Sequence, residues 1–518
     1  MHFKRLRPNV SLLLLAVAAG SVALADNKAE VPEWDLGDLH LNVVPRTSAE
    51  AARIAAVTAL TADFSAPQPF EERPGGAATV RVFPDANAFS QPSGNISFAD
   101  ELTFKLGNGL FRKLWVSSPS STLASDGLGP LYNARSCQRC HIKDGRGHPP
   151  ENADDNSISM FLRISIPAPQ DAAIEEITDY IAALPDPNYG SQLQDFAVQG
   201  HASEYRLEID YTEEVITLAD GTEVSLRHPE YEAANLGYGP LHPQAMLSPR
   251  VAPQMIGLGL LEAVPSTDIL ANADPDDLDG DGISGRPNII WSQQFDRPML
   301  GRFGLKAGSP TIMEQSAAAF AGDIGISSPM FPAGAGDCTA GQTVCQNAIH
   351  GDGDARGTEI DAESMDLVTF YSRNLAVPAR RGVDDPQVLQ GKAVFYATGC
   401  TSCHTPSFVT HRLEDQPEQS FQLIWPFTDM LLHDMGPGLA DNRPEARATG
   451  SEWRTPPLWG IGLTKQVSGH TYFLHDGRAR SLLEAVLWHG GEAQAQRDAV
   501  VTLPTAERDA LIAYLESL

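Results

Sequence analysis

Two short motifs place cysteine and histidine at a spacing that suits the covalent attachment of haem. They are Cys137-Gln-Arg-Cys140-His141 and Cys400-Thr-Ser-Cys403-His404. Two thiols on one helical turn can reach both vinyl groups of a porphyrin, and the histidine that follows then lies under the iron. A four-cysteine zinc site would not need a histidine after each pair, and a redox dithiol would not need two copies. The sequence therefore predicts two c-type haems, with His141 and His404 as proximal ligands.

A second constellation of chemically active residues is acidic. Asp277, Asp279 and Asp281 follow the D-x-D-x-D-G spacing of a calcium loop, and Ile283 lies where such a loop offers a backbone carbonyl. The twelfth position holds Asn288 instead of Glu, which weakens the affinity or changes the geometry. The spacing predicts a bound calcium ion, and the alternative is an Asp-rich surface turn.

The remaining two cysteines, Cys338 and Cys345, lie in a polar segment with turn character. In an oxidising compartment, such a close pair is typical of a local disulfide. All six cysteines then have a role, which leaves none for thiol catalysis.

Helices are expected to position the haem motifs. The segment 391–399 has apolar residues at helical spacing and a final glycine before Cys400, as in the helix that leads into the haem motif of a cytochrome c domain. The chain before Cys137 differs, because a predicted helix is followed there by a loop rich in Gly and Pro. A β-hairpin is expected at 205–209 and 223–226, around Asp220-Gly221. The predicted helices are 48–60, 104–116, 172–184, 363–375, 386–398, 481–489 and 505–518.

These elements predict a mainly α fold with two cytochrome c-like haem domains, the first with long irregular insertions and small β elements. The expected order is a signal peptide (1–25), an acidic extension (26–85), an N-terminal haem domain (86–365) and a C-terminal haem domain (366–518). The signal combines basic residues, an apolar stretch and a small-x-small cleavage site at Ala23-Leu-Ala25. An uncleaved membrane anchor is the alternative, but the apolar run is short for a span. We expect an exported protein that is soluble after cleavage.

The chain is strongly acidic, with a formal net charge of -29 that becomes -32 when Lys4, Arg5 and Arg7 leave with the signal. This charge disfavours binding to nucleic acid or anionic lipid. It suits a cationic partner such as a small basic electron-carrier protein, a cytochrome or a cupredoxin. A plain solvated acidic surface explains the charge equally well.

Several runs of the chain resemble bacterial di-haem oxidoreductases that are labelled thiol oxidoreductases. The runs are 104–116, 125–135, 144–147, 246–255 and 474–480, and the likeness extends from Ala88 to Leu518. The family is related to the di-haem cytochrome c peroxidases and to the di-haem enzyme that matures methylamine dehydrogenase. This kinship implies a periplasmic protein with one electron-transfer haem and one peroxide-reacting haem. The thiol label finds no support, because every cysteine has another role.

The same resemblance predicts a sixth ligand for the C-terminal haem. In di-haem peroxidases a methionine ligand falls 14 residues after the histidine of a His-Asp/Asn-Gly motif, and from His475 this position is His489. An imidazole in place of a thioether lowers the potential of the iron. The alternative is that His489 caps a helix C-terminus. His475 is expected to bond a haem propionate or to orient its loop. For the N-terminal haem the candidate sixth ligands are His148, His201, His242 and Met255, unless the position is open.

A peroxidatic site with an open position needs an acid–base group and a cation near the peroxide. Arg250, Gln254 and Glu262 form a polar triplet on an otherwise apolar segment, and we assign them as catalytic candidates. The alternative is a packed helix whose polar groups bond propionates. Four tryptophans could relay electrons or pack the core: Trp115, Trp291, Trp453 and Trp459.

The leading function hypothesis is a peroxidase-type oxidoreductase that reduces peroxide, or uses it to oxidise a substrate, at the N-terminal haem. Electrons would pass through the C-terminal haem. One alternative is a non-enzymatic electron carrier in which both irons have six ligands. Another is an oxygenase that acts on an organic substrate.

Overall fold

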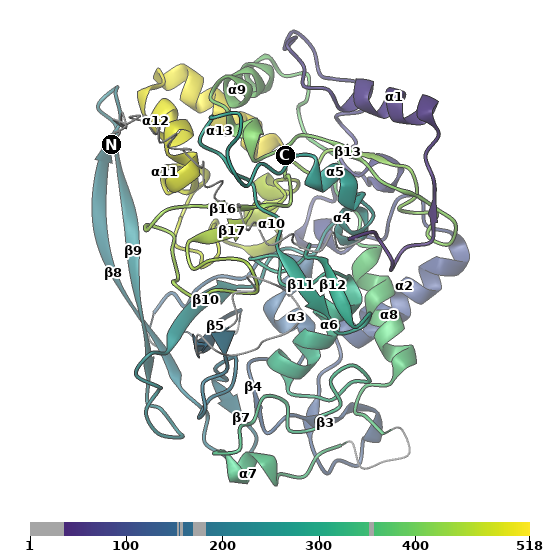
Figure 1. The fold of residues 1–518 in the computed structure, drawn as a ribbon, viewed down its shortest axis with the longest axis vertical. Helices are drawn as coiled ribbons and strands as arrows, with labels where there is room; N and C mark the ends of the chain where they lie inside the picture. The colour runs from purple at the N-terminus through teal and green to yellow at the C-terminus, as the bar shows by residue number, and fades with distance from the viewer. Residues whose placement is uncertain (1–35, 153–154, 156–158, 169–182, 352–356) are drawn as a thin grey trace, which may run out of the picture. The chain divides into compact units, whose positions relative to one another are not determined.

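The fold combines helices with many short strand pairs and one long hairpin (Figure 1). The computed structural model describes residues 36–152, 155, 159–168, 183–351 and 357–518. Leu36 to Leu518 make up one compact unit. The predicted signal peptide and most of the predicted helix over 172–184 lie outside the described residues, and the last two residues of that helix form a strand instead.

The helices begin at residues whose side chains cap them. Thr47 and Glu50 form a capping box at the first helix, and Ser97 accepts a hydrogen bond from Asp100 N at the second. The α-helices of the described residues are α1 (Ser48–Thr58), α2 (Phe98–Phe111), α3 (Cys137–Cys140), α4 (Leu258–Glu262), α5 (Ser266–Leu270), α6 (Ile312–Ala319), α7 (Thr343–Gln346), α8 (Ala362–Arg373), α9 (Pro386–Ala397), α10 (Thr464–Ser468), α11 (Leu482–Leu487), α12 (Gln494–Thr502) and α13 (Thr505–Ser517). A π-helical turn, η5 (Phe320–Ile324), continues α6 directly.

Most strands are short and pair only once. The three-stranded sheet has the order β10-β5-β6, and the other strands form two-stranded sheets. The strands are β1 (Val43–Val44), β2 (Val116–Ser117), β3 (Asp126–Leu128), β4 (Leu131–Tyr132), β5 (Met160–Pro167), β6 (Ala183–Leu184), β7 (Phe196–Ala197), β8 (Arg206–Thr217), β9 (Glu223–Ala234), β10 (Met246–Val251), β11 (Ile289–Ser292), β12 (Arg297–Leu300), β13 (Phe408–Val409), β14 (Arg412–Leu413), β15 (Leu423–Ile424), β16 (Leu432–Asp434) and β17 (Glu452–Arg454).

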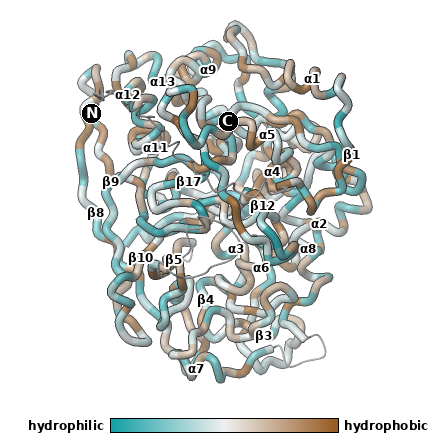
Figure 2. The backbone as a smooth tube through the Cα atoms, in the orientation of Figure 1, coloured by the Kyte–Doolittle hydropathy of each residue, from teal (hydrophilic) through white to brown (hydrophobic). Residues whose placement is uncertain are grey.

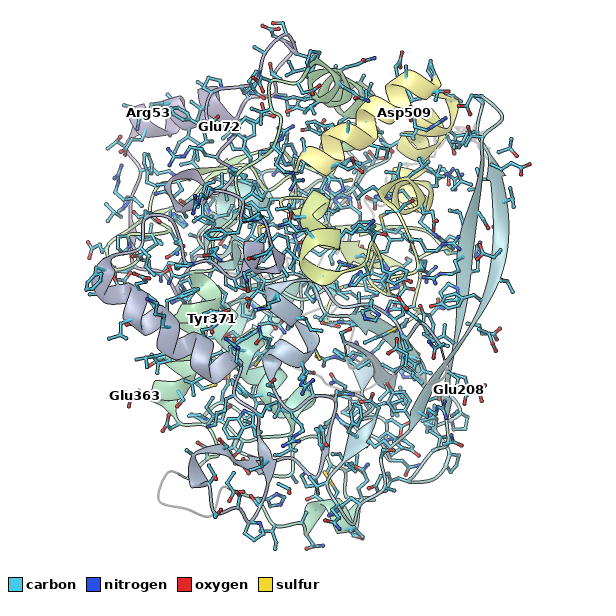
Figure 3. The ribbon with its side chains drawn as sticks, turned by 180° about the vertical axis from the view of Figure 1, so that it is seen from behind. Arg53, Glu72, Glu208, Glu363, Tyr371 and Asp509 are labelled. Atoms are coloured by element: carbon cyan, nitrogen blue, oxygen red, sulfur yellow. A yellow bond between two sulfur atoms is a disulfide. The ribbon has the colours of Figure 1, made fainter. Side chains whose placement is uncertain are left out.

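A hairpin around Asp220-Gly221 is confirmed, but it is much longer than predicted and its two predicted segments do not pair with each other: Ile209 lies opposite Tyr231, and Leu226 lies opposite Glu214. β8 and β9 pair antiparallel along their whole length, from Arg206 opposite Ala234 to Thr217 opposite Glu223. Hydrophilic and hydrophobic residues are interspersed along both strands (Figure 2), and Figure 3 shows Glu208 on the outer edge. With this hairpin and the sheet around β5, the fold mixes α and β structure. The prediction of a mainly α fold was too narrow, because the insertions between the haem motifs form strands.

Two helix pairs lie beside the haem motifs. α2 packs against α8, and α9 packs against α13 (Figure 1). Each pair has its own hydrophobic cluster, with Phe104 and Val368 in the first and Val394 and Leu511 in the second. Most of the predicted helix over 363–375 falls in the predicted C-terminal haem domain (366–518). In the structure this helix, α8, contacts α2 and therefore belongs beside the first motif.

Candidate di-haem site

The first haem motif lies beside the crossing of α2 and α8. The helices cross closely because Gly107 has no side chain, and a Cβ there would collide with the carbonyl oxygen of Leu367. Four residues later, the ring of Phe111 lies 5.2 Å from the ring of Tyr371 and 6.3 Å from that of His141. Figure 3 shows Tyr371 where the two helices meet. The crossing thus supplies an aromatic wall next to His141.

The second haem motif has the same construction. A Cβ at Gly391 of α9 would collide with the carbonyl oxygen of Ala510 of α13. Four residues after this glycine, Phe395 lies 5.3 Å from Tyr514 and 6.3 Å from His404. The two attachment sites are therefore duplicates of one design. In the sequence only the haem motif is visible as a repeat, because insertions of unequal length separate the other shared parts.

A further duplicated segment joins the two sites. Gly257 and Gly460 both have left-handed backbone conformations, with φ of 71° and 74°. Their N–H groups donate to Leu375 O and Leu518 O, each at 3.0 Å, at the ends of the helices that pack beside the motifs. A Cβ on Gly257 would meet the Trp459 ring, and a Cβ on Gly460 would meet the Ile256 side chain at 2.6 Å. Each glycine thus packs against the residue directly before the other glycine.

Both motif histidines are oriented by a backbone carbonyl. His141 Nδ1 donates to Pro253 O at 2.7 Å, and His404 Nδ1 donates to Phe427 O at 2.9 Å. The same bond in each case leaves Nε2 for a metal, which is the usual way in which a protein fixes a ligating imidazole. Burial lowers the pKa of each histidine to about 4, so both rings are neutral, the form that ligates.

His489 lies close to His404. Its Nδ1 donates to Ala485 O at 2.8 Å, so this ring also keeps Nε2 free for a ligand. Burial is the main cause of the low pKa of His404, and the neighbouring His489 lowers it further. The bond to Ala485 O also satisfies a carbonyl of the last helical turn, as the capping alternative required. Capping uses only Nδ1, so it does not compete with iron ligation through Nε2.

The loop that leads to His489 has a counterpart in the first copy. Phe473 bridges to Ala479 in one loop, and Phe303 bridges to Ser309 in the other. Each loop ends in a helix N-cap whose hydroxyl accepts from the N–H of a glutamate three residues on, at 3.1 Å. These caps are Ser481 with Glu484 at α11, and Thr311 with Glu314 at α6. α6 is therefore the counterpart of α11.

Counted from these caps, the residue at the position of His489 is Ala319. Its neighbours, Ala318 and Phe320, have no side chain that can ligate iron either. Directly after Ala319 the helix widens into the π-helical turn η5, a rare geometry that is frequent at functional sites. The counterpart of the predicted ligand helix thus has no ligating side chain at the position of His489 or at the two positions beside it.

The four candidate sixth ligands of the first haem lie on other elements. The His148 ring lies 5.0 Å from the ring of His470, and its Nδ1 donates to Pro149 O. His242 Nδ1 accepts from Gln244 N, and Met255 packs on the cluster around α2 and α8. His201 donates its backbone N–H to Val198 O. Of these four, Met255 packs on the cluster that also contains Ala317 of α6.

The three predicted catalytic side chains bind different parts of the chain. Arg250 pairs with Glu445 at 2.7 Å. Gln254 Nε2 donates to Trp459 O at 2.7 Å, and the preceding residue, Pro253, holds the proximal histidine. The residues span the end of β10, a loop and α4, so they do not share one face. Gln254 directly follows the residue that binds His141, and its predicted contact with peroxide stays a prediction.

Glu262 is fully buried and its carboxylate is already engaged. Oε2 accepts from Arg373 Nε and Oε1 accepts from Ile312 N, each at 2.8 Å. Burial raises the pKa of Glu262, but Arg373 and the nearby His40 outweigh it and lower the pKa overall. A carboxylate in this ion pair caps α6 and is poorly suited to exchange protons near neutral pH.

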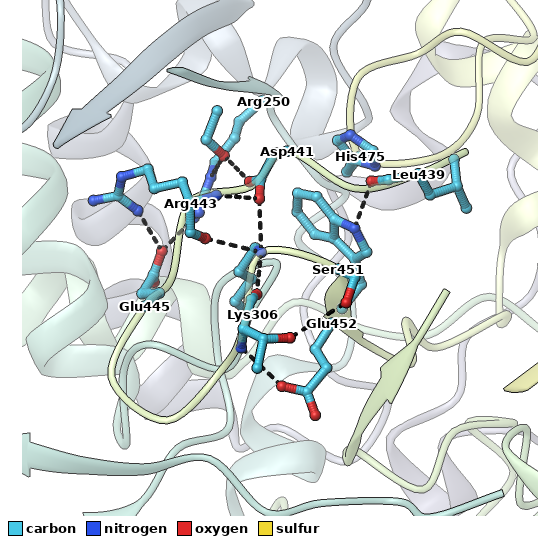
Figure 4. A network of polar contacts seen from close by, with 12 residues as sticks. Arg250, Lys306, Leu439, Asp441, Arg443, Glu445, Ser451, Glu452 and His475 are labelled. Carbon is cyan, nitrogen blue, oxygen red and sulfur yellow. Dashed lines mark hydrogen bonds and ion pairs between the residues drawn. The ribbon is translucent and has the colours of Figure 1, made fainter. Parts of the chain in front are cut away.

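A buried polar network lies between the two corresponding loops, 303–309 and 473–479 (Figure 4). Lys306 Nζ donates to Asp441 Oδ1 at 2.9 Å and to Thr449 O at 2.7 Å. It also lies 4.4 Å from the ring centroid of Trp453, and that ring stacks on His475 at 3.8 Å. Burial lowers the pKa of Lys306 to about 8. His475 thus orients its loop through Trp453, in line with one of its two predicted roles.

The four relay candidates differ in burial. Trp115, Trp453 and Trp459 are buried in three separate hydrophobic clusters, as core packing requires, and Trp291 on β11 is partly exposed. Trp459 is the one that contacts Gly257.

The acidic loop gathers carboxylates, but in a different set from the predicted one. One ligand oxygen each of Asp274, Asp277 and Asp279 lies within 4.8 Å of the others. Asp281 instead accepts a hydrogen bond from Ile283 N at 2.8 Å. Asp274, Asp277 and Asp279 also accept hydrogen bonds from backbone N–H groups of the loop, so what distinguishes Asp281 is only that it lies outside the cluster, which Asp274 joins.

The predicted pairing of the remaining cysteines is confirmed, because Cys338 and Cys345 form a disulfide. Cys137, Cys140, Cys400 and Cys403 form no disulfide, as the predicted haem attachment requires. Among the described residues, no helix has the length and apolar character needed to cross a membrane.

Comparison with known proteins agrees with this duplicated site. Residues 70–518 match the family model described as "Di-haem oxidoreductase, putative peroxidase". The chain belongs to this family. Haem is thus the cofactor of the family, and the resemblance inferred from the sequence runs is confirmed. No curated protein matched the chain.

Among solved structures, a chain of hydrazine synthase from Kuenenia stuttgartiensis, pressurised with xenon, is similar at 18% identity with a TM-score of 0.22. The match covers 35% of this di-haem oxidoreductase and 63% of that chain. So low a TM-score carries no argument about fold or function.

Proposed function

We propose that this di-haem oxidoreductase is an exported, periplasmic c-type cytochrome of the peroxidase type. It reduces peroxide at the first haem and receives electrons through the second. The residues that would hold the first haem are Cys137, Cys140 and His141, and those that would hold the second are Cys400, Cys403, His404 and His489. Haem iron supplies the electron transfer that splits the O–O bond.

The observation that carries this proposal is the difference between His489 and Ala319 at the same position of two duplicated helices. A side chain that ligates iron from the second side suits electron transfer, whereas a methyl group leaves space for a small ligand. The reaction balances when peroxide takes up two electrons and two protons and gives two waters. A small electron-carrier protein supplies the electrons.

The proposed function is tested by adding hydrogen peroxide to the purified oxidised and half-reduced protein and recording the haem spectrum. We expect one haem to respond within the mixing time and two equivalents of reduced carrier to be consumed for each peroxide. Spectra that stay unchanged in every redox state would favour the electron-carrier alternative. Consumption of oxygen with an organic substrate, but not of peroxide, would favour the oxygenase alternative.

Covalent attachment predicts the mass of the mature protein. After export, the intact mass should equal the chain from Asp26 onward plus two haems, since each pair of thiols binds one porphyrin. Mass spectrometry and a haem stain of the denatured protein check this. The matched variant Cys400→Ala/Cys403→Ala should lose one haem and keep the other. A single haem in the unaltered protein would contradict the assignment.

Calcium at the acidic loop also stays a prediction, now with Asp274, Asp277 and Asp279 as the carboxylate ligands. After chelation and dialysis against calcium, metal analysis should find about one ion per chain, and Asp279→Asn should weaken the binding. Asp366→Asn, at an exposed position of α8, is the control. The prediction is wrong if the unaltered chain retains no calcium and its melting temperature does not depend on the ion.

A further inference from the structure

The π-helical turn after Ala319 brings a carboxyl group to the first haem motif. Asp323 stands four residues after Ala319, so it lies on nearly the same face of the helix. Its backbone carbonyl accepts from Asn133 N at 2.8 Å and from Ala134 N at 3.0 Å, which binds the helix end to the chain leading into Cys137. Burial and, after it, the charge of the Asp323 carboxylate raise the pKa of Cys137 to about 12, so the two groups lie close together.

The amide side chain of Gln192 holds this carboxyl group, and a second acid, Asp195, joins the same network. Gln192 Nε2 donates to Asp323 Oδ1 at 2.8 Å and to Asn133 Oδ1 at 2.7 Å. Asn133 Nδ2 in turn donates to Asp195 Oδ1 at 3.0 Å. Among the described residues, no ion pair joins either acid to a cation. Asp323 therefore differs from Glu262, whose carboxylate is held by the guanidinium of Arg373.

The surroundings of Asp323 and Asp195 raise the pKa of both carboxyl groups, so each keeps its proton to a higher pH than usual. Burial raises the pKa of Asp323, with Arg163 of β5 opposing it, and burial raises the pKa of Asp195 to about 7. The hydroxyl of Tyr205, a residue that is 2% exposed, lies within hydrogen-bonding reach of the Leu162 backbone, whereas the side-chain oxygen of Gln192 has no hydrogen-bond partner in the described part of the chain. The charge of Asp195 raises the pKa of Tyr205, so this hydroxyl lies near the network. A buried polar atom without a partner points to a place where a polar ligand is missing.

We propose that Asp323 is the catalytic acid–base residue of peroxide reduction at the first haem, an inference that rests on the proposed function. Asp323 takes the proton from one peroxide oxygen and delivers it to the other, which leaves as water when the O–O bond breaks. The oxygen that remains becomes the second water with two electrons from the carrier protein and two protons. Gln192 is a positioning residue that orients the carboxyl group. The geometry assigns this role to Asp323 instead of Arg250, Gln254 and Glu262.

The decisive variant is Asp323→Asn, which keeps the shape and removes the proton exchange. Peroxide reduction should slow by about 100-fold or more, and both haems should stay attached. Asp323→Glu, which keeps a carboxyl group, should recover part of the rate. Asp366→Asn on the outer face of α8 is the matched control and should react as the unaltered protein does.

Fluoride and cyanide binding to the oxidised protein, followed by absorbance, give a readout that does not depend on turnover. Fluoride binds with a proton, so its affinity should rise as the pH falls through the pKa of Asp323, and Asp323→Asn should abolish this dependence. Unchanged rates and an unchanged pH dependence in that variant would overturn the proposal, as would their loss in Asp195→Asn alone. If the unaltered protein shows the fluoride dependence but does not reduce peroxide, the proposed function fails while the proton-exchanging role of Asp323 stands.

Discussion

Replacing His489 with alanine should turn one of the two haems from low-spin to high-spin. The imidazole is held by Ala485 O on one nitrogen and lies next to His404, so its loss leaves the second haem with a single protein ligand. A five-coordinate ferric haem binds cyanide and fluoride readily, and its potential rises when an imidazole is withdrawn. Absorption and electron paramagnetic resonance spectra of the oxidised protein measure the change.

His350→Ala is the matched control, because this histidine lies in the loop after α7, on another part of the chain than His489. This variant should keep both haem spectra. Exogenous imidazole should restore the low-spin signal of His489→Ala and leave the control as it was. If His489→Ala has the spectrum of the unaltered protein, the ligand must be sought on another element and the duplicated helices lose their significance for function.

The cysteine and histidine motifs were predictable because their chemistry is local. Five consecutive residues contain both thiols and the proximal ligand, and the disulfide between Cys338 and Cys345 is closed by a short segment. The hairpin was predictable from the Asp220-Gly221 turn, although its length was not. In each case the decisive residues are neighbours in the chain.

The surroundings of the predicted catalytic triplet could not be read from the sequence, because neighbours in sequence need not share an environment. Arg250, Gln254 and Glu262 lie within a short segment, but a strand, a loop and a helix direct them to Glu445, Trp459 and Arg373. The network around Asp323 has the opposite property. Its members come from three distant segments, the chain before Cys137, the loop before β7 and the end of η5, and only tertiary packing unites them.

The duplication was hidden for a related reason. Gly107 and Gly391 have the same role four residues before a phenylalanine, and Thr311 and Ser481 cap corresponding helices. Insertions between these parts destroy any fixed period, so a search for repeats by spacing does not find them. The contacts identify α6 and α11 as corresponding helices, and only then does Ala319 stand out as the residue that replaces His489. Without that correspondence, an alanine in a helix has no special meaning.

Replacing Ala319 with histidine should therefore close the first haem. The new imidazole would occupy the position that His489 has in the duplicated helix, and a histidine there costs less than about 1 kcal/mol of helix stability. We expect the high-spin signal of the oxidised protein to disappear and peroxide reduction to fall by about 100-fold or more, while haem content stays at two per chain. The measurements are the absorption spectrum, the intact mass and the rate of carrier oxidation by peroxide.

Ala318→His is the control. It introduces the same imidazole but places it about 100° away around the helix axis, so it tests whether the position of the imidazole matters. It should leave the high-spin haem and most of the activity intact. If both variants behave alike, the effect comes from disturbed packing of α6, and Ala319 does not mark the open side of the haem. The expected pattern is that Ala319→His becomes low-spin and inactive, that Ala318→His does not, and that His489→Ala shows the reverse spectral change at the second haem. In that case one helix position decides which haem transfers electrons and which reacts with peroxide.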